Sequence, residues 1–387
     1  MRTANDRRYT SRLKMKEKKL SFKKKIFFTL VIFLGFLGIL EVVGSIYYHL
    51  GFSAEKRNLL ETALGLKASD RYHTLRFIPH PYFNYVGNPE YRFSDGLQPH
   101  NSRGFRRPEW TAKKKGTLRI VALGGSTTYG LHSRDGKDVW PALIEKMLQS
   151  RWGPGIEVLN LGVHAYTAHE IIGVAAMLVP TLSPDIVLIH VGANDAFAAC
   201  YPDEGGPDNT EFRFSWSYKP IPGFLKFLMR QSRLIRVLGY RFITAKGYQP
   251  GDMVAAMQYR HPSDREAAKN AGKATGKYFR QNIRSLIALV KEIGAIPVLM
   301  THPLNPKWEY PRKLFHRGLV EAHRRNNRII AEIAGSRHIP LVDLYAKMRD
   351  AVYFTDAIHA NPVGMKLKAE LIAPVVSAVI KELKREK

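Results

Sequence analysis

Cysteine is almost absent from this sequence, since its 387 residues include only Cys200. A single thiol cannot form an intrachain disulfide, and without a cysteine cluster the common structural zinc sites are excluded. His164 and His169 are five residues apart, which differs from the HExxH spacing of zinc proteases. The sequence therefore predicts neither a disulfide framework nor a metal centre.

Motifs of nucleotide binding are also missing. The glycine-rich segment GGSTTYG, residues 124–130, lacks the GxxxxGK[ST] pattern of a phosphate-binding loop and the GxGxxG pattern of a dinucleotide-binding turn. It differs from the GxSxG elbow of the α/β-hydrolases because Thr128 occupies the place of the second glycine. No helix-turn-helix, zinc-finger or RNA-binding signature is present. We therefore expect no cofactor and no nucleic-acid partner.

Acidic residues are few compared with basic ones. The chain has 60 Lys and Arg against 33 Asp and Glu, a formal net charge of +27. Eleven of the basic side chains lie within the first 25 residues, where only Asp6 and Glu17 oppose them. A basic protein can face phospholipid or anionic polysaccharide, or it can simply have a well-solvated surface.

A long apolar segment follows the basic tail. Residues 26–40 read IFFTLVIFLGFLGIL, Glu41 interrupts, and residues 42–50 read VVGSIYYHL. Such a stretch is long enough to cross a bilayer as a helix. We predict a transmembrane signal anchor at 26–50, with the tail 1–25 in the cytoplasm and the remainder outside, because cationic flanks stay on the cytoplasmic side. The alternatives are a buried core helix and a cleaved signal peptide, although no A-x-A cleavage motif follows.

The remainder divides into a preface and a larger domain. Residues 51–116 are rich in aromatics, Pro and Asn, and we expect an irregular segment packed on the domain. Residues 117–387 alternate apolar runs, typical of buried strands, with helical stretches, which predicts an α/β domain with a parallel sheet. Residues 200–274 interrupt this alternation and are interpreted as a cap over the site, with a plain surface insertion as the alternative. Strands are predicted at 118–124, 156–162, 185–192, 296–302 and 339–345, and helices at 138–151, 167–180, 275–293, 312–335 and 362–383.

Chemically useful residues follow the predicted strands. Ligands of parallel α/β sheets bind beyond the carboxyl ends of the strands, where Ser126, Gly162 and Asn194 are expected. Asp356 and His359 are three residues apart, so one helical turn can bring them to one side. His359 can then activate the Ser126 hydroxyl while Asp356 orients the imidazole. The N–H groups of Ser126 and Gly162 and the Asn194 amide can form an oxyanion hole.

Each of these residues alone has a simpler explanation. Ser126 could only cap its helix, and Asn194 could bond its own backbone in a turn. Gly162 could be a tight strand exit, while Asp356 and His359 could be a helix cap and a surface imidazole. Their occurrence together, in this order and at strand ends, favours one common site.

The four blocks resemble the SGNH hydrolases, also called GDSL-type esterases and lipases, whose Ser, Gly, Asn and His match Ser126, Gly162, Asn194 and His359. Asp356 matches the acid that precedes the histidine in that family. The resemblance spans residues 118–383 and implies a three-layer α/β/α sandwich with a flavodoxin-like parallel sheet. It also implies ester hydrolysis through an acyl-enzyme without a cofactor. The sequence NSRGFR followed by LGGSTTYG is similar to bacterial membrane-anchored members.

The sequence departs from the family pattern at two places. Gly125 replaces the Asp of the usual GDS block, and His164 and Ala165 follow Gly162 in place of a second glycine. Asp195 and His302 also lie at the predicted site edge, and we interpret both as structural.

These features together predict a single-pass serine esterase of the bacterial inner membrane, with its catalytic domain outside the cytoplasm. The expected substrates are O-acyl or O-acetyl esters of an envelope glycan or lipid. An acyltransferase acting on polysaccharide is one alternative. A non-catalytic envelope protein that binds polysaccharide with the same fold is another, motivated by Gly125 and the aromatic preface.

Overall fold

The computed structural model describes residues 21–64, 66, 76–80, 82–93, 95–106, 109–213, 221–245, 262–308 and 313–386. The chain divides into two compact units, an α/β unit of residues 61–220 and 247–387 and a helical unit of residues 1–60 and 221–246. Most of the basic tail, parts of the preface and parts of the insertion 200–274 lie outside the described residues.

The α/β unit is built on one parallel sheet with the strand order β4-β3-β5-β6-β7. Numbered along the domain, this is the order 2-1-3-4-5 of flavodoxin-like folds, so the predicted fold class is confirmed. The first two strands have the predicted bounds, and the other three are shorter than predicted, one of them at its last residues and two at both ends. The strands are β3 (Leu118–Gly124), β4 (Ile156–Gly162), β5 (Ile186–His190), β6 (Ile296–Met300) and β7 (Leu341–Val342).

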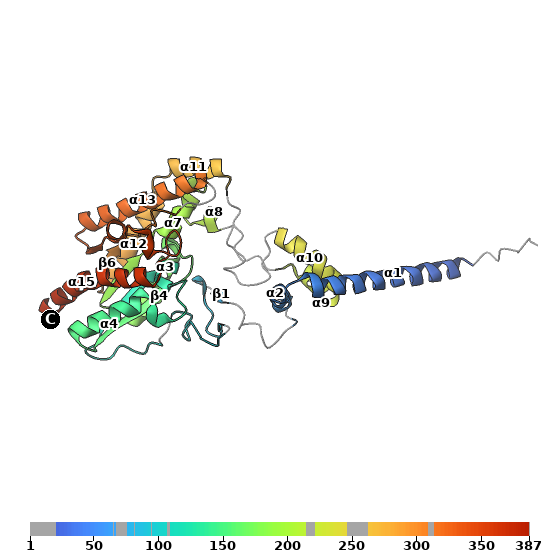
Figure 1. The fold of residues 1–387 in the computed structure, drawn as a ribbon, viewed down its shortest axis with the longest axis horizontal. Coiled ribbons are helices and arrows are strands. Elements are labelled where there is room, and N and C mark those ends of the chain that lie inside the picture. Colours follow the sequence, from blue (N-terminus) through green and yellow to red (C-terminus); the bar gives the residue numbers. More distant parts are fainter. Residues whose placement is uncertain are drawn as a thin grey trace, which may run out of the picture. The chain divides into compact units, whose positions relative to one another are not determined.

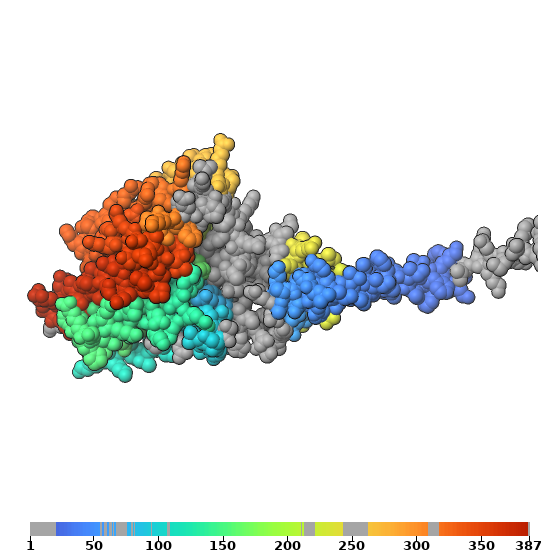
Figure 2. Space-filling model, in the orientation of Figure 1, coloured from blue at the N-terminus to red at the C-terminus, as the bar shows by residue number. Residues whose placement is uncertain are grey.

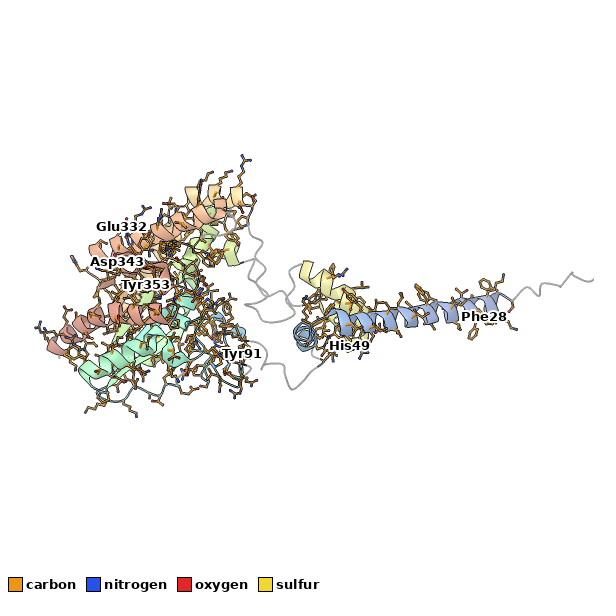
Figure 3. The ribbon with its side chains drawn as sticks, in the orientation of Figure 1. Phe28, His49, Tyr91, Glu332, Asp343 and Tyr353 are labelled. Carbon is orange, nitrogen blue, oxygen red and sulfur yellow. The ribbon has the colours of Figure 1, made fainter. Side chains whose placement is uncertain are left out.

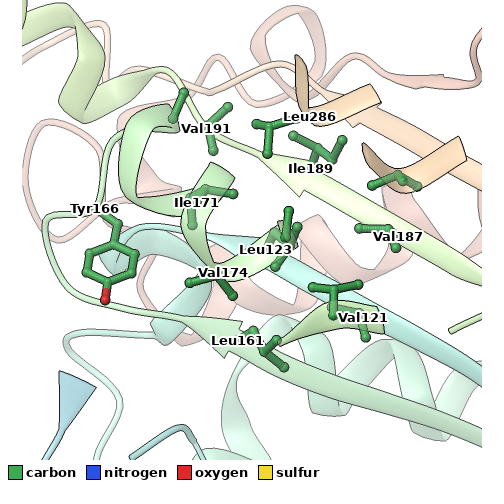
Figure 4. Close-up of a cluster of buried hydrophobic side chains, with 14 of the residues drawn as sticks. Val121, Leu123, Leu161, Tyr166, Ile171, Val174, Val187, Ile189, Val191 and Leu286 are labelled. Carbon is green, nitrogen blue, oxygen red and sulfur yellow. The ribbon is translucent and has the colours of Figure 1, made fainter. Parts of the chain in front are cut away.

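Helices cover both faces of the sheet (Figure 1). Successive strand residues point to opposite faces, so Val121 and Leu123 belong to one core and Ile120 and Ala122 to the other. Figure 4 shows the first core, where the β3 side chains meet those of α5. The covering helices are α5 (Ala168–Met177), α12 (Lys277–Glu292) and α13 (Lys313–Ser336) on the first face, and α4 (Trp140–Trp152) and α15 (Pro362–Glu386) on the second.

Short helices occupy the connections of this unit, many of them directly after strands. They are α3 (Ser126–Tyr129), α6 (Val179–Leu182), α7 (Ala193–Ala198), α8 (Thr210–Arg213), α11 (Asp264–Lys273) and α14 (Leu344–Lys347), with 3-10 turns at Gly136–Asp138, Pro202–Gly205 and Ala351–Tyr353. Two of them, α3 and α7, follow β3 and β5 and carry the serine and the asparagine of the predicted site.

The described part of the preface contains a small antiparallel pair, β1 (Phe77–His80) and β2 (Asn84–Gly87). The Tyr85 hydroxyl donates to the His164 carbonyl at 2.6 Å, and the Tyr166 hydroxyl donates to the Phe83 carbonyl at 2.6 Å. The preface is therefore fastened to the loop that follows β4, close in sequence to Gly162.

The side chain of Arg106, in the preface, is buried and hydrogen-bonds to the segment that follows α3. Its guanidinium donates to the carbonyls of Tyr129 and Gly130 at 2.8 Å each, of Ser133 at 2.5 Å and of Arg134 at 3.2 Å. The fork of donors on arginine suits several carbonyls at once, which a lysine ammonium cannot match. The guanidinium thus fixes the end of the helix that carries Ser126.

The helical unit combines α1 (Phe22–Gly51) with α9 (Gly223–Gln231) and α10 (Arg233–Ala245), and α2 (Ala54–Leu64) begins in it. Helix α1 is long and apolar enough to cross a membrane, and its most apolar window is unburied. Figure 2 shows the first half of α1 uncovered on the face in view, and Figure 3 shows side chains such as that of Phe28 standing out from it. Helices α9 and α10 come from the middle of the insertion 200–274, whose role as a cap stays a prediction.

We predict that Arg106→Lys lowers the free energy of unfolding of the α/β unit by about 2 kcal/mol or more, because charge-assisted bonds to several carbonyls are lost. Arg103→Lys is the matched control, since Arg103 is exposed and lies three residues before Arg106. Urea unfolding followed by tryptophan fluorescence measures both variants. Equal stability of the two would contradict the role assigned to Arg106.

Candidate active site

The predicted nucleophile lies at the junction of β3 and α3. Ser126 is the first residue of α3 and is buried. The helix ends at Tyr129, and Gly130, with a positive φ of 80°, closes the turn after it. The Gly130 N–H donates to the Ser126 carbonyl at 2.9 Å. The Trp140 indole donates to the Thr127 carbonyl at 3.1 Å and holds α3 from the α4 side. The serine hydroxyl is therefore presented by a short, firmly held helix.

Ser126, His359 and Asp356 form a continuous hydrogen-bonded chain. His359 Nε2 lies 2.7 Å from Ser126 Oγ, and His359 Nδ1 lies 2.7 Å from Asp356 Oδ2. These contacts join residues 233 positions apart, so the tertiary structure brings together the three residues that the sequence predicted. In this arrangement the imidazole can accept the serine proton while the carboxylate holds its other nitrogen.

The loop before α15 orients the aspartate and the histidine. Asp356 Oδ1 accepts hydrogen bonds from the backbone N–H groups of Ile358 and His359, each at 2.9 Å. Burial alone would raise the pKa of Asp356, but the His359 imidazole and these N–H donors outweigh it and hold that pKa below its ordinary value. Asp356 is therefore ionised at neutral pH and can stabilise an imidazolium.

A second histidine, which sequence reasoning missed, contacts the same carboxylate. His132 Nε2 lies 3.2 Å from Asp356 Oδ2, and the rings of His132 and His359 have centroids 5.0 Å apart. His132 lies in the loop after α3, and no spacing in the sequence relates it to Asp356. Among the described residues, His132, Asp356 and His359 are the one group placed to hold a metal ion. An ion there would take up the nitrogen and oxygen atoms that join the triad, so it would compete with the hydrogen bonds described above.

The three predicted oxyanion donors differ in their surroundings. The Ser126 N–H opens α3, and the first N–H groups of a helix have no partner within it. The Asn194 amide donates to the Tyr166 carbonyl at 2.8 Å and keeps a second hydrogen. The Gly162 N–H donates to Asn160 Oδ1 at 2.9 Å, so it would have to share that bond to serve an oxyanion. The oxyanion hole stays a prediction for all three.

Two glycines of the site have little space for a side chain. A Cβ on Gly162 would overlap the backbone of Thr128 and Tyr129 in α3. A Cβ on Gly125 would come 2.6 Å from the Asn194 amide nitrogen and 3.1 Å from the Tyr166 carbonyl oxygen. The departure from the GDS block therefore makes room for the Asn194 side chain beside Ser126.

A buried cluster of histidines lies under α3. Thr127 Oγ1 is 3.0 Å from His302 Nε2, Thr128 Oγ1 is 3.1 Å from His190 Nδ1, and the rings of His190 and His302 stack with centroids 4.6 Å apart. His323 continues the cluster from α13, with its Nε2 3.4 Å from His302 Nδ1. The structural role expected for His302 is supported by these contacts. His190 and His323 were not recognised from the sequence because their partners come from distant elements.

Lys368 on α15 is fully buried, and its ammonium nitrogen has no hydrogen-bond partner among the described residues. Burial lowers the pKa of Lys368 from 10.5 to about 7. Burial is also the largest cause of the lowered pKa values of His190 and His302, and the Lys368 charge adds to it. The cluster is thus held neutral beneath α3.

Asp195 braces the turn that carries Asn194. Its carboxylate accepts from the Gly192 N–H at 3.0 Å and from the Ala168 N–H at 2.9 Å, so it joins the starts of α7 and α5. Burial raises the pKa of Asp195 to about 6. These contacts agree with the structural role expected from the sequence.

An open apolar recess adjoins the segments that carry the site, with about 360 Å³ of free space that includes open solvent. Its walls include Ala193 and Ile358, the chain neighbours of Asn194 and His359. The remaining lining residues are Phe197, Leu304, Trp308, Leu319, Val320, His323 and Ala357. The recess can hold a small apolar group.

The family model described as GDSL-like lipase/acylhydrolase matches residues 122–367, more than half of the chain. A lipase/acylhydrolase structure from Enterococcus faecalis is 18% identical, covering 68% of this chain and 96% of that chain at a TM-score of 0.41. A GDSL-like lipase from Bacteroides thetaiotaomicron is 17% identical, with coverage of 71% and 93% and a TM-score of 0.40. A catalytic mutant of an acetylxylan esterase from Geobacillus stearothermophilus is also 17% identical, with coverage of 68% and 96% and a TM-score of 0.40. No curated protein matches the chain.

We predict that Gly125→Ala reduces kcat/KM for a nitrophenyl ester by about 10-fold or more, because the added methyl displaces the Asn194 amide from a position suited to an oxyanion. Gly272→Ala on α11 is the matched control, since a Cβ there meets nothing within 4 Å. Steady-state hydrolysis rates measure both variants. Full activity in Gly125→Ala would show that the site does not need Asn194 where it lies.

We predict that Lys368→Met stabilises the protein at pH 7 and flattens its pH dependence. Because the pKa of Lys368 is lowered from 10.5 to about 7, the unfolded chain binds more protons than the folded one between these values. The wild-type free energy of unfolding should therefore rise with pH across this window, and the variant should lose that rise. Lys366→Met, at an exposed position of the same helix, is the control. Denaturant unfolding at pH 7 and pH 9.5 distinguishes the outcomes, and parallel curves for wild type and Lys368→Met would refute the assignment.

Proposed function

Because the chain belongs to the GDSL-like lipase/acylhydrolase family it is an ester-hydrolysing enzyme, and we propose that Ser126, His359 and Asp356 are its catalytic residues. The family match confirms the resemblance to the SGNH hydrolases noted in the sequence. The observation that carries the assignment of roles is the chain of two 2.7 Å contacts from Ser126 through His359 to Asp356.

In the proposed reaction Ser126 Oγ attacks the ester carbonyl carbon as His359 Nε2 takes the hydroxyl proton. The tetrahedral intermediate places its negative oxygen against the Ser126 N–H and the Asn194 amide, with the Gly162 N–H as a third donor if it leaves Asn160. His359 returns the proton to the departing alcohol, which leaves an acyl-enzyme. Water then attacks the acyl-enzyme with His359 again as the base, and the carboxylic acid departs.

The proposed location is the outer side of the bacterial inner membrane. Helix α1 supplies the anchor, and the eleven cations among the first 25 residues keep the N-terminus in the cytoplasm. The substrate is then an O-acyl or O-acetyl ester of an envelope glycan or lipid. The basic charge left on the rest of the chain suits an anionic polymer or lipid surface. The apolar recess beside Asn194 and His359 suits a small acyl group.

We predict that Ser126→Ala abolishes labelling by a fluorophosphonate probe and lowers the turnover of nitrophenyl acetate by about 1000-fold or more. Ser133→Ala is the matched control, because Ser133 lies in the loop after α3 and its hydroxyl donates to the Asp135 carbonyl at 2.9 Å. Probe labelling on a gel and steady-state hydrolysis measure both variants. Labelling that survives in Ser126→Ala would contradict the assigned nucleophile.

The same assay separates hydrolysis from acyl transfer. With an acylated donor ester and a soluble polysaccharide acceptor, a hydrolase releases free acid at a rate that the acceptor leaves unchanged. A transferase instead moves the acyl group to the acceptor, again with dependence on Ser126. A folded wild type that neither labels nor turns over any ester would favour the polysaccharide-binding alternative.

A further inference from the structure

Helices α9 and α10 are amphipathic and expose large apolar side chains. Phe224 and Phe227 on α9 are 76% and 57% exposed, and Leu238 and Phe242 on α10 are 58% and 50% exposed. Residues three or four apart share a helix face, so each pair forms one apolar stripe. Exposed aromatic stripes of this kind mark contact with a partner or a membrane.

The charged side chains of α9 and α10 are all basic. Residues 221–245 contain five Lys and Arg and no Asp or Glu. The cations are Lys226, Arg230, Arg233, Arg236 and Arg241. A basic amphipathic helix with exposed Phe and Leu matches the composition of helices that lie in the surface of an anionic bilayer.

Glu41 of α1 caps the start of α10. Its carboxylate accepts from the Ser232 hydroxyl at 2.5 Å and from the backbone N–H groups of Arg233 at 2.6 Å and Leu234 at 3.3 Å. An acidic side chain at a helix N-terminus satisfies free N–H groups and complements the helix dipole. The one charged residue inside the apolar segment thus has a specific partner in a helix almost 200 residues later.

The contact continues toward the end of α1. Gly44 packs so closely that a Cβ there would come 2.6 Å from Leu234 Cα. Tyr48 is fully buried under the Arg236 guanidinium, whose carbon lies 5.2 Å from the ring centroid. The rings of Phe52 and Tyr240 lie 5.0 Å apart. The α9–α10 pair is therefore fixed to the last three turns of α1.

The position of this contact along α1 determines how deep in the bilayer the contact lies. Lys25 and Glu41 are separated by about 24 Å along the helix axis, slightly less than the thickness of about 30 Å of a hydrocarbon core. When Lys25 lies at the inner boundary, Glu41 and the α10 N-terminus lie in the outer leaflet, and residues 44–52 reach the headgroups. At that depth the stripes of α9 and α10 meet acyl chains, while the exposed Arg230, Arg233 and Arg241 meet lipid phosphates.

We propose that α9 and α10 form an interfacial membrane hairpin, clamped to α1 by Glu41 and laid into the outer surface of an anionic bilayer. This inference rests on the proposed anchoring by α1. It also means that α1 is a retained structural element, since cleavage after it would remove Glu41, Gly44 and Tyr48 from α10. The hairpin lies within residues 200–274, which were interpreted above as a cap. In this proposal it contacts lipid rather than the ester substrate.

The test places a fluorescent reporter on the full-length protein in nanodiscs of phosphatidylcholine and phosphatidylglycerol. Cys200 is the sole cysteine and is buried, so Cys200→Ser gives a clean background. Single cysteines at Phe227 and Leu238 report on the hairpin and one at Ile32 reports on the anchor. One at Val363, exposed and apolar on α15 of the other unit, is the matched control. Each is labelled with nitrobenzoxadiazole and quenched by doxyl-labelled lipid or by aqueous iodide.

We expect doxyl lipid to quench the Phe227, Leu238 and Ile32 reporters about twofold or more beyond the Val363 reporter, with the reverse order for iodide, because interfacial helices bury their apolar face roughly 5–10 Å deep. One contrary outcome is that iodide quenches the Phe227 and Leu238 reporters as strongly as the Val363 reporter while the Ile32 reporter stays in lipid. This result would refute the membrane hairpin but not the anchoring by α1. Protection of Phe227 and Leu238 from both quenchers would mean that protein, such as a second copy, covers the stripe, and would also overturn it. An aqueous Ile32 reporter would refute the anchoring and the hairpin together.

Discussion

Close contact between α3 and the ends of β3 and β4 is the constraint on which the site depends. A Cβ at Gly124 would overlap the Thr128 hydroxyl, and one at Gly162 would overlap the α3 backbone. Because Ser126 is the first residue of α3, this contact decides where its hydroxyl lies relative to His359. The geometry that joins Ser126 to His359 therefore depends on two glycines without side chains as well as on the side chains themselves.

Burial of the polar groups beneath α3 costs folding free energy. Thr127 and Thr128 are tied to His302 and His190, and a buried network stabilises a structure only when its members are satisfied. The Lys368 ammonium, without a partner among the described residues, opposes burial near neutral pH. Buried polar groups without hydrogen-bond partners are expected close to functional sites, because function there requires particular residues at particular positions.

In the helical unit, one apolar helix has two roles. Its first half is uncovered and apolar, as suits lipid, while Glu41 and Tyr48 make specific contacts with α10. A carboxylate within an apolar segment is costly unless it has partners, and here the donors of the α10 N-terminus supply them. Helix α10, in the segment that interrupts the α/β alternation, is therefore coupled to α1 by hydrogen bonds as well as by hydrophobic contact.

The sequence by itself determined the parallel sheet and its two layers of helices, and it singled out Ser126, Asp356 and His359 as the residues proposed to be catalytic. Long apolar runs have one stable arrangement when they alternate with helices, and the blocks around Ser126 and His359 lie at fixed points of that pattern. Only the tertiary structure decided that His132 meets Asp356, that Asn160 occupies the Gly162 N–H, and that Glu41 caps α10. These contacts join elements far apart in the chain through single polar atoms. Hydrophobic periodicity predicts which face of a helix or strand is buried. It does not predict which distant atom will accept or donate a particular hydrogen bond.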